Sequence, residues 1–145
     1  LNLQTVKRYI DIFEQSFLIY RIYPYSTRKR DEISKSPKIY FVDTGLRNAL
    51  IDDFSPLSLR PDSGALFENF IINEAIKANR YFNGGYAIYY WRTKAGAEVD
   101  LVMEKGKQLL GIEIKSAKSR HQGTVAFKNR YPKAFTKIIN KTNFY

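Results

Sequence analysis

Apolar residues near the start of the chain recur every three to four positions, the spacing of one face of an α-helix. This pattern covers Leu3 to Phe17, and we expect its apolar face to pack against the rest of the chain. Two β-rich runs follow, Phe17 to Tyr25 and Lys38 to Val42, separated by a charged and serine-rich stretch. Together they predict a long, exposed hairpin. Asp43 then precedes a short helical run through Leu50, and we interpret it as the capping or turn residue.

The remainder of the chain has the pattern of a helix, three strands, a short helix and a last strand. The stretch Ile51 to Ser63 contains two prolines among mixed polar residues and is interpreted as a linker. The sequence therefore predicts a module over residues 1–50, a linker over 51–63 and a domain over 64–145. We expect the elements of this domain near residues 64–80, 87–92, 98–103, 108–115, 121–130 and 135–140.

The predicted helix from Gly64 to Arg80 carries one acidic residue on its apolar side. A helical wheel predicts an exposed stripe of Asn69, Asn73, Lys77 and Arg80, and a buried arc of Phe67, Ile71, Ile72, Ala75, Ile76 and Ala78. Glu68 falls in the middle of the buried arc. A carboxylate aimed at a core needs a partner, so Glu68 is either half of an ion pair with a Lys or Arg or part of a metal or active site.

The two strands that flank Gly106 carry further acidic residues. Strand alternation places Val99, Leu101 and Met103 on one face and Glu98 and Asp100 on the other. If Gly106 and Lys107 are the turn residues, position 105 faces 108, and by the same register Asp100 faces Glu113. Lys115 lies two residues further along the same strand as Glu113. We therefore expect Asp100, Glu113 and Lys115 to share one face of the hairpin.

Two neighbouring carboxylates repel each other unless a cation or a proton lies between them. A hard divalent ion such as Mg²⁺ or Mn²⁺ is the natural occupant, because it prefers oxygen ligands and keeps several waters. The alternative is a charged hairpin face on which Glu113 pairs with Lys115 and Asp100 is solvated. The chain has no cysteine and the single His121, so a metal here would be held by oxygen ligands.

The charge balance favours a polyanionic partner. Lys and Arg number 24 against 14 Asp and Glu, a net charge of +10, and such an excess attracts nucleic acid through its phosphates. One basic cluster is Arg28, Lys29 and Arg30, and the other comprises Lys115, Lys118, Arg120, Lys128 and Arg130. We see neither an apolar stretch of membrane-spanning length nor a signal-peptide pattern, so we expect a soluble, cytoplasmic protein without membrane contact.

Aromatic residues gather on one predicted strand, at Tyr86, Tyr89, Tyr90 and Trp91. They are suited to stacking on unpaired bases, although packing within the sheet is the simpler interpretation. Arg92 follows at the strand end, where it would contact a phosphate near the acidic residues.

The order and motifs of the second unit resemble a known superfamily. A helix with Glu68, a second strand with Asp100 and a third strand with Glu113-Ile114-Lys115 look like the restriction-endonuclease-like fold of PD-(D/E)XK enzymes. More closely, the chain resembles an uncharacterised domain that lies C-terminal to an AAA-type ATPase module in bacterial and archaeal proteins. The segments that carry this resemblance are Ser36 to Leu46, Gly64 to Phe70, Tyr90 to Arg92, Glu98 to Asp100 and Ile112 to Lys115.

The resemblance implies a mixed sheet flanked by helices, preceded by a small winged-helix-like α+β module. It implies Asp100, Glu113 and Glu68 as Mg²⁺ or Mn²⁺ ligands, with Lys115 positioning the attacking water. Arg28 to Arg30 would then lie on a phosphate backbone, and we group Arg92, Lys118 and Arg120 with them as candidate DNA contacts. No other cofactor is implied. The chain lacks an initiator Met and a P-loop motif, so we expect the ATPase module to lie upstream in a longer protein.

Two functions from different classes follow from these observations. The first is a Mg²⁺-dependent nuclease-like domain coupled to an ATPase and acting on DNA. The second is a non-catalytic accessory module that binds DNA or a protein partner and regulates the ATPase. A soluble α/β domain with incidental basic charge is the third and simplest interpretation. Oligomer formation is compatible with all three.

Overall fold

The computed structural model describes residues 2–27, 36–115 and 122–144. An N-terminal helix, α1 (Leu3–Gln15), leads into a two-stranded antiparallel sheet of β1 (Ile19–Ile22) and β2 (Lys38–Phe41). The short helices α2 (Thr44–Leu50) and η1 (Leu57–Leu59) then connect β2 to the long helix α3 (Ser63–Tyr81). Asp43 caps α2 as predicted, since its carboxylate accepts the N–H of Leu46 at 2.9 Å.

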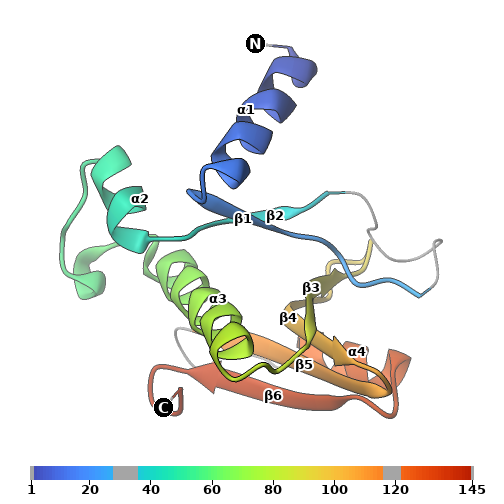
Figure 1. Cartoon of the computed structure of the whole chain (residues 1–145). Coiled ribbons are helices and arrows are strands. Elements are labelled where there is room, and N and C mark those ends of the chain that lie inside the picture. Colours follow the sequence, from blue (N-terminus) through green and yellow to red (C-terminus); the bar gives the residue numbers. More distant parts are fainter. Residues whose placement is uncertain (1, 28–35, 116–121, 145) are drawn as a thin grey trace.

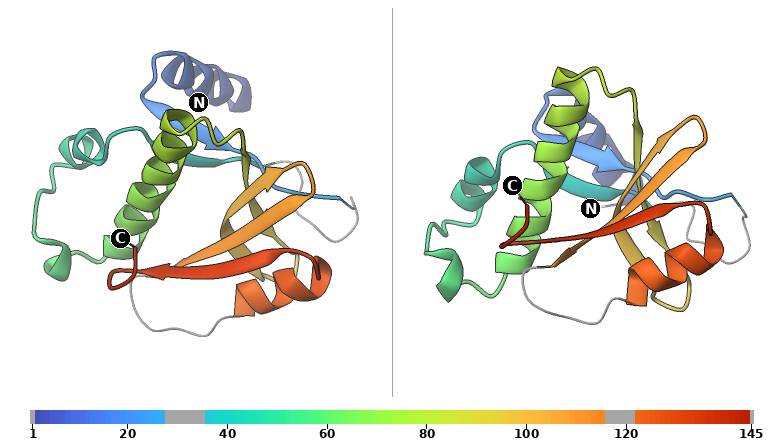
Figure 2. Two further views of the ribbon diagram at one scale, coloured as in Figure 1. Left: turned by 60° about the horizontal axis from the view of Figure 1, so that its bottom comes forward. Right: turned by 90° about the horizontal axis from the view of Figure 1, so that it is seen from below.

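The larger sheet of the described residues follows α3 in the order β3-β4-β5-β6. Its strands are β3 (Ala87–Arg92), β4 (Glu98–Lys105), β5 (Gln108–Lys115) and β6 (Phe135–Asn140), and α4 (Gln122–Arg130) precedes β6. The first three strands are antiparallel and β6 runs parallel to β5, which makes the sheet mixed. Helices α3 and α4 cover opposite faces of this sheet (Figures 1 and 2). The fold is therefore α/β with a four-stranded mixed sheet.

Each face of the sheet has its own core. On the α3 face, the buried residues Phe67, Ile71 and Ile72 of the helix pack against Leu101, Ile112 and Ile114 of the strands. On the α4 face, Phe127 packs against Trp91, Val99 and Val102. Trp91 and Tyr90 are buried within these cores, so the packing interpretation of the aromatic strand is confirmed for these two residues.

A β-bulge interrupts the predicted alternation in β4. Tyr89 lies opposite Val102 and Trp91 opposite Val99, so Asp100 and Leu101 together oppose the single residue Tyr90. Val99 therefore belongs to the α4 core and Leu101 to the α3 core. The prediction that Val99 and Leu101 share a face was wrong. It assumed strict alternation along the strand, and the extra residue of the bulge breaks that alternation.

The turn of the β4–β5 hairpin is as predicted. Lys105 lies opposite Gln108, which makes Gly106 and Lys107 the turn residues. Gly106 has φ +58°, a left-handed conformation that suits a tight turn and that glycine adopts at little cost. The paired residues end at Leu101 and Ile112, one step short of Asp100 and Glu113.

The exposed stripe predicted for α3 is partly buried. The Asn69 side chain exchanges hydrogen bonds with the backbone N–H and carbonyl of Phe41, and Asn73 donates to the carbonyls of Phe41 and Val42. These asparagines hold β2 against the helix, which is why they are buried. Ala78, which was predicted to be buried, is exposed. A helical wheel gives the periodicity of a helix but not how many neighbours cover it.

The N-terminal helix departs from prediction in the opposite sense. No residue of α1 is buried, and its apolar side chains Leu3, Tyr9 and Phe13 are exposed. The helix is attached instead through Arg21 of β1, which forms ion pairs with Asp11 and Glu14. Beyond β1, Tyr23 and Tyr25 form backbone hydrogen bonds with Tyr90, so the chain joins the free edge of β3.

The segment predicted as a linker is ordered around one buried arginine. Arg60 is 5% exposed, and its guanidinium contacts Asp62 at 2.9 Å and the Asp53 carbonyl at 2.5 Å. Arg47 of α2 also reaches Asp62, at 2.7 Å. These contacts fasten the start of α3 to α2.

Candidate functional site

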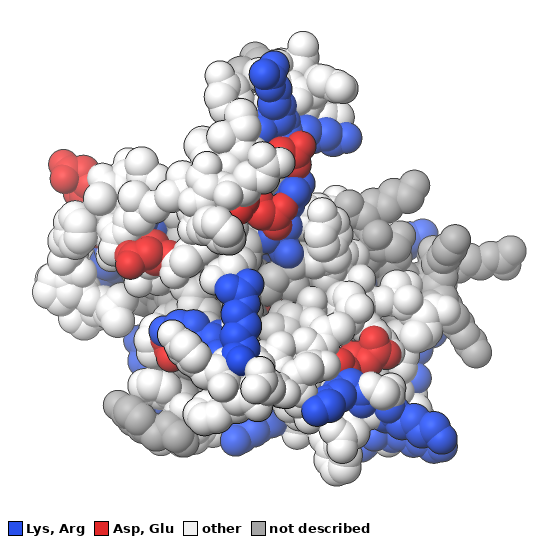
Figure 3. Space-filling view, viewed as in Figure 1, with Lys and Arg blue, Asp and Glu red and all other residues white. Residues whose placement is uncertain are grey.

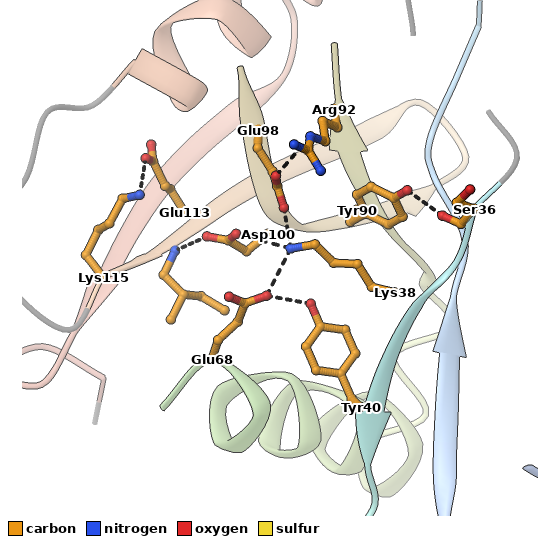
Figure 4. A network of polar contacts seen from close by, with 11 residues as sticks. Ser36, Lys38, Tyr40, Glu68, Tyr90, Arg92, Glu98, Asp100, Glu113 and Lys115 are labelled. Carbon is orange, nitrogen blue, oxygen red and sulfur yellow. Dashed lines mark hydrogen bonds and ion pairs between the residues drawn. The ribbon is translucent and has the colours of Figure 1, made fainter. Parts of the chain in front are cut away.

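A lysine lies at the centre of the acidic residues on the α3 face. Lys38 is the first residue of β2, and its ammonium is 3.0 Å from Oε1 of Glu68 and 3.5 Å from Oδ1 of Asp100. It also forms an ion pair with Glu98. Figure 4 shows the three carboxylates converging on this nitrogen from α3 and β4. We call Lys38, Glu68, Glu98 and Asp100 the Lys38 cluster.

The fold brings these residues together by different means. Glu68 projects from α3 beside the core residue Phe67, whereas Glu98 and Asp100 project from β4 toward the same helix. The bulge at Asp100 and Leu101 makes this arrangement, because it turns two successive side chains toward α3. Lys38 reaches the cluster because Asn69 and Asn73 hold the end of β2 against α3.

Further hydrogen bonds fix the orientation of the carboxylates. The Tyr40 hydroxyl donates to Oε1 of Glu68 at 2.6 Å, and the Ile114 N–H donates to Oδ2 of Asp100 at 2.8 Å. Arg92 lies 3.4 Å from Oε2 of Glu98. The prediction that Arg92 lies near the acidic residues is thus confirmed in position, and its phosphate contact stays a prediction.

Burial and crowding perturb the groups of the cluster. Burial raises the pKa of the Asp100 carboxyl to about 6, and the charge of Glu68 adds to the rise despite the Ile114 N–H and Lys38. Burial acts to lower the pKa of the Lys38 ammonium, but the carboxylates of Glu68, Glu98 and Asp100 outweigh it and raise that pKa. Burial and the Glu68 charge likewise raise the pKa of the Tyr40 hydroxyl. Lys38 therefore remains a cation while Asp100 is easily protonated.

Glu113 lies in different surroundings, on the α4 side. It is 3% exposed, and its Oε2 accepts hydrogen bonds from the N–H and hydroxyl of Thr124, each at 3.2 Å. Its Oε1 is 2.8 Å from the Lys115 ammonium. The expectation that Asp100 and Glu113 share a face was wrong, because the bulge turns Asp100 toward α3 while Glu113 follows the regular alternation of β5.

Lys115 connects the two groups electrostatically. Burial acts to lower the pKa of its ammonium, but the hydrogen bond to Glu113 and the charges of Glu113, Asp100 and Glu68 together outweigh it and raise that pKa. Figure 4 shows the Glu113–Lys115 pair beside the Lys38 cluster. The Lys115 ammonium therefore pairs with Glu113 and is also influenced by the charges of Asp100 and Glu68.

The structure brings together only part of the predicted set. Glu68 and Asp100 meet through Lys38, and the ion-pair interpretation of Glu68 is confirmed. Neither Lys38 nor Glu98 was predicted as a site residue from the sequence. Glu98 carries a local signal, since it lies two residues before Asp100, whereas Lys38 carries none because it is distant in sequence. Several predicted residues lie outside the described residues, namely Arg28, Lys29, Arg30, Lys118, Arg120 and His121.

The donors of the Lys38 cluster are those that a hard divalent cation prefers, since all three are carboxylates. Among the described residues, however, no three acidic side chains are close enough together to hold a metal directly. Their oxygens are spaced around an ammonium instead. The cluster therefore has the donor atoms that a divalent cation prefers, but its carboxylates are spaced for the Lys38 ammonium.

Both halves of the chain match models of known sequence families. Residues 63–143 match the family model described as a domain of unknown function, DUF4143. Residues 1–57 match a second domain of unknown function, DUF8612. No solved structure matches the chain, and none of the described helices is long and apolar enough to cross a membrane.

The similar proteins are longer than this chain. Uncharacterized proteins of Mycobacterium tuberculosis and Mycobacterium bovis are each 36% identical over 113 residues, which is 77% of this chain and 25% of theirs. An uncharacterized protein of Haemophilus influenzae is 24% identical over 110 residues, 76% of this chain and 24% of its own. The chain spans about a quarter of the length of these relatives. On the match over residues 63–143, the chain belongs to the DUF4143 family.

Proposed function

We propose that residues 63–143 form a divalent-metal-dependent phosphodiesterase domain of the PD-(D/E)XK kind, acting on DNA. The observation that carries this proposal is the convergence of Glu68, Glu98 and Asp100 on one cationic nitrogen. Three carboxylates this close repel one another unless a cation lies among them, and their oxygens are the donors that a divalent ion prefers. The order of α3, β3, β4, β5, α4 and β6 supports the proposed fold.

Each residue has a role in this proposal. Glu68, Glu98 and Asp100 would hold a Mg²⁺ or Mn²⁺ ion, and the Ile114 N–H would keep Asp100 oriented. Such an ion, when bound, would neutralise the charge that develops on a phosphodiester. Lys115 would orient an attacking water from the adjacent pair, with Glu113 fixing the Lys115 ammonium at 2.8 Å. Glu113, a ligand by resemblance, acts here through Lys115.

The charge of the surface supports a nucleic acid as the substrate. The net charge is +10, and Figure 3 shows Lys and Arg side chains at the end of the sheet where the β4–β5 hairpin turns. A cavity of about 430 Å³ at this end is lined by Lys107, Arg130 and Lys133 together with Tyr25 and Tyr131. Cations around an open cavity attract phosphates without reading sequence.

The length of the relatives supports an upstream partner module. Because they are about four times as long as the matched segment, a larger protein has room for the ATPase that the resemblance implies. We propose that this module and the described domain act in one chain, with a winged-helix-like module between them.

A second candidate is a non-catalytic module that binds DNA or protein and regulates that ATPase. Lys38 is the observation that favours it, because its ammonium already neutralises part of the acidic charge. A domain in this role needs no metal, whereas the phosphodiesterase does. Metal binding therefore discriminates between the two.

The test is calorimetric titration of Mn²⁺ into the wild-type chain and into Asp100→Asn, followed by a plasmid-nicking assay on the same samples. We expect wild-type binding and nicking that are both lost in Asp100→Asn. Glu74→Gln is the matched control, because Glu74 forms an exposed ion pair with Lys77 within α3. A wild-type chain that binds no Mn²⁺ would overturn the phosphodiesterase and leave the regulatory module.

A further inference from the structure

The cation of the acidic cluster comes from a different module than the acids. Lys38 lies within the segment matched by the DUF8612 model, and Glu68, Glu98 and Asp100 lie within the DUF4143 match. The N-terminal module thus places a positive charge among three carboxylates of its neighbour.

We propose that Lys38 is a built-in counter-cation that a divalent metal must displace, so that the N-terminal module controls metal loading of the acidic site. This inference rests on the proposed metal-dependent function. It adds a regulatory residue outside the PD-(D/E)XK motif, on a strand that precedes the domain. The structure with Lys38 seated among the carboxylates is then the closed state of the site.

The charges of the cluster explain why a divalent ion would compete with Lys38. One ammonium faces three carboxylates, so the cluster keeps an excess of negative charge when Lys38 is seated. An ion of charge two would balance more of it and takes the same oxygen donors. Lysine suits a displaceable cation, since its ammonium is a compact charge on a flexible stem.

The surroundings of Lys38 leave it room to withdraw. Its side chain is 24% exposed, and a cavity of about 280 Å³ beside the cluster is lined by Lys38, Tyr40, Arg47, Glu68 and Asn69. The ammonium also lies over the ring of Tyr90, 5.5 Å from its centroid, in a cation–π contact. The strand itself stays in place, since Asn69 and Asn73 bind the backbone of Phe41. Rotation of one side chain therefore opens the cluster without unfolding β2.

The experiment compares Mn²⁺ binding to the wild-type chain, Lys38→Met and the control Lys77→Met by calorimetry at one pH and salt concentration. We expect Lys38→Met to bind Mn²⁺ at least tenfold more tightly than wild type, and Lys77→Met to match wild type because Lys77 forms an exposed pair with Glu74 on the surface of α3. Thermal unfolding provides a second readout. In chelator Lys38→Met should melt below wild type, because three carboxylates repel one another, and Mn²⁺ should raise its melting temperature more than that of wild type.

Equal or weaker Mn²⁺ binding in Lys38→Met, with binding abolished by Asp100→Asn, would overturn the role of Lys38 and leave the metal site standing. Absence of Mn²⁺ binding in every folded variant would overturn the metal-dependent function and this inference together. Lys38→Gln is measured alongside, because its amide can still hydrogen-bond the carboxylates if the methionine variant does not fold. It carries the same expectation of tighter binding.

Discussion

On the α3 face of the sheet, Glu68, Glu98 and Asp100 share one cation that comes from a distant strand. On the α4 face, Glu113 is almost fully buried and has its partners close by, in Thr124 and Lys115. The first group keeps excess negative charge, and the pKa of its Asp100 is raised. The second group is satisfied by local hydrogen bonds. The contrast teaches that acidity alone does not mark a site. What distinguishes the α3 face is that the cation among its carboxylates comes from a distant strand and not from a neighbouring residue.

The most disruptive way to break this contrast is to separate α4 from the sheet. A Cβ atom at Gly123 would lie 1.8 Å from the backbone oxygen of Glu98, so α4 has to move away in Gly123→Ala. Overpacking against a backbone that cannot yield should cost more than about 3 kcal/mol of unfolding free energy. Urea denaturation measures it. Val125→Ala is the control, because this side chain lies on the same helix and is 57% exposed, and an equal loss there would contradict the prediction.

The pKa of Asp100 predicts how stability depends on pH on the α3 face. Burial and Glu68 raise this pKa to about 6 in the folded chain, above the ordinary value of about 4 in the unfolded chain. The folded state therefore binds the proton more tightly, and its contribution, present below pH ~4, is lost as the pH rises to ~6. The loss is on the order of 3 kcal/mol. Denaturation in chelator from pH 4 to 7 should show it for wild type and not for Asp100→Asn, and parallel curves would contradict it.

The local satisfaction of Glu113 is tested by Thr124→Val. The substitution keeps the shape of the side chain and the backbone N–H, but removes the hydroxyl that donates to Glu113 at 3.2 Å. A hydrogen bond to a buried charge contributes about 1.5–3 kcal/mol, so unfolding should become easier by roughly 2 kcal/mol. Thr142→Val, at an exposed turn, serves as the control. An unchanged denaturation midpoint would show that Glu113 does not depend on Thr124.

The smallest and most selective test removes one charge from each face. We expect Glu68→Gln to weaken Mn²⁺ binding about tenfold, which corresponds to about 1.4 kcal/mol. Glu113→Gln should change the affinity less than about threefold, because its carboxylate is turned toward Thr124. Calorimetry on the two variants measures both. Equal losses of Mn²⁺ affinity in the two variants would show that Glu113 is a metal ligand, as the resemblance implies.

Local sequence signals were sufficient for most elements. The turn at Gly106 and Lys107 and the cap at Asp43 follow from residue preferences that act over a few positions. The strand Ala87–Arg92 was predicted with the bounds that the structure shows. Where the conformation of a segment depends mainly on residues close in sequence, hydrophobic pattern and residue propensity determine it.

Predictions that needed distant neighbours did less well. Asn69 and Asn73 were expected in water, but β2 covers them. The apolar face of α1 was expected to pack, but no residue of this helix is buried in the described chain. The bulge at Asp100 and Leu101 carries no sequence signal that we recognised, since neither residue is a glycine.

The sequence by itself determined the residues with chemistry to offer, the strands and helix that carry them, and the turn that folds β4 back on β5. Only the tertiary structure determined which of these residues lie next to one another. The bulge turned Asp100 away from Glu113, and β2 delivered Lys38 from 30 residues before Glu68. The physical reason is that ion pairing depends on distance in space, which the order of residues along the chain does not fix.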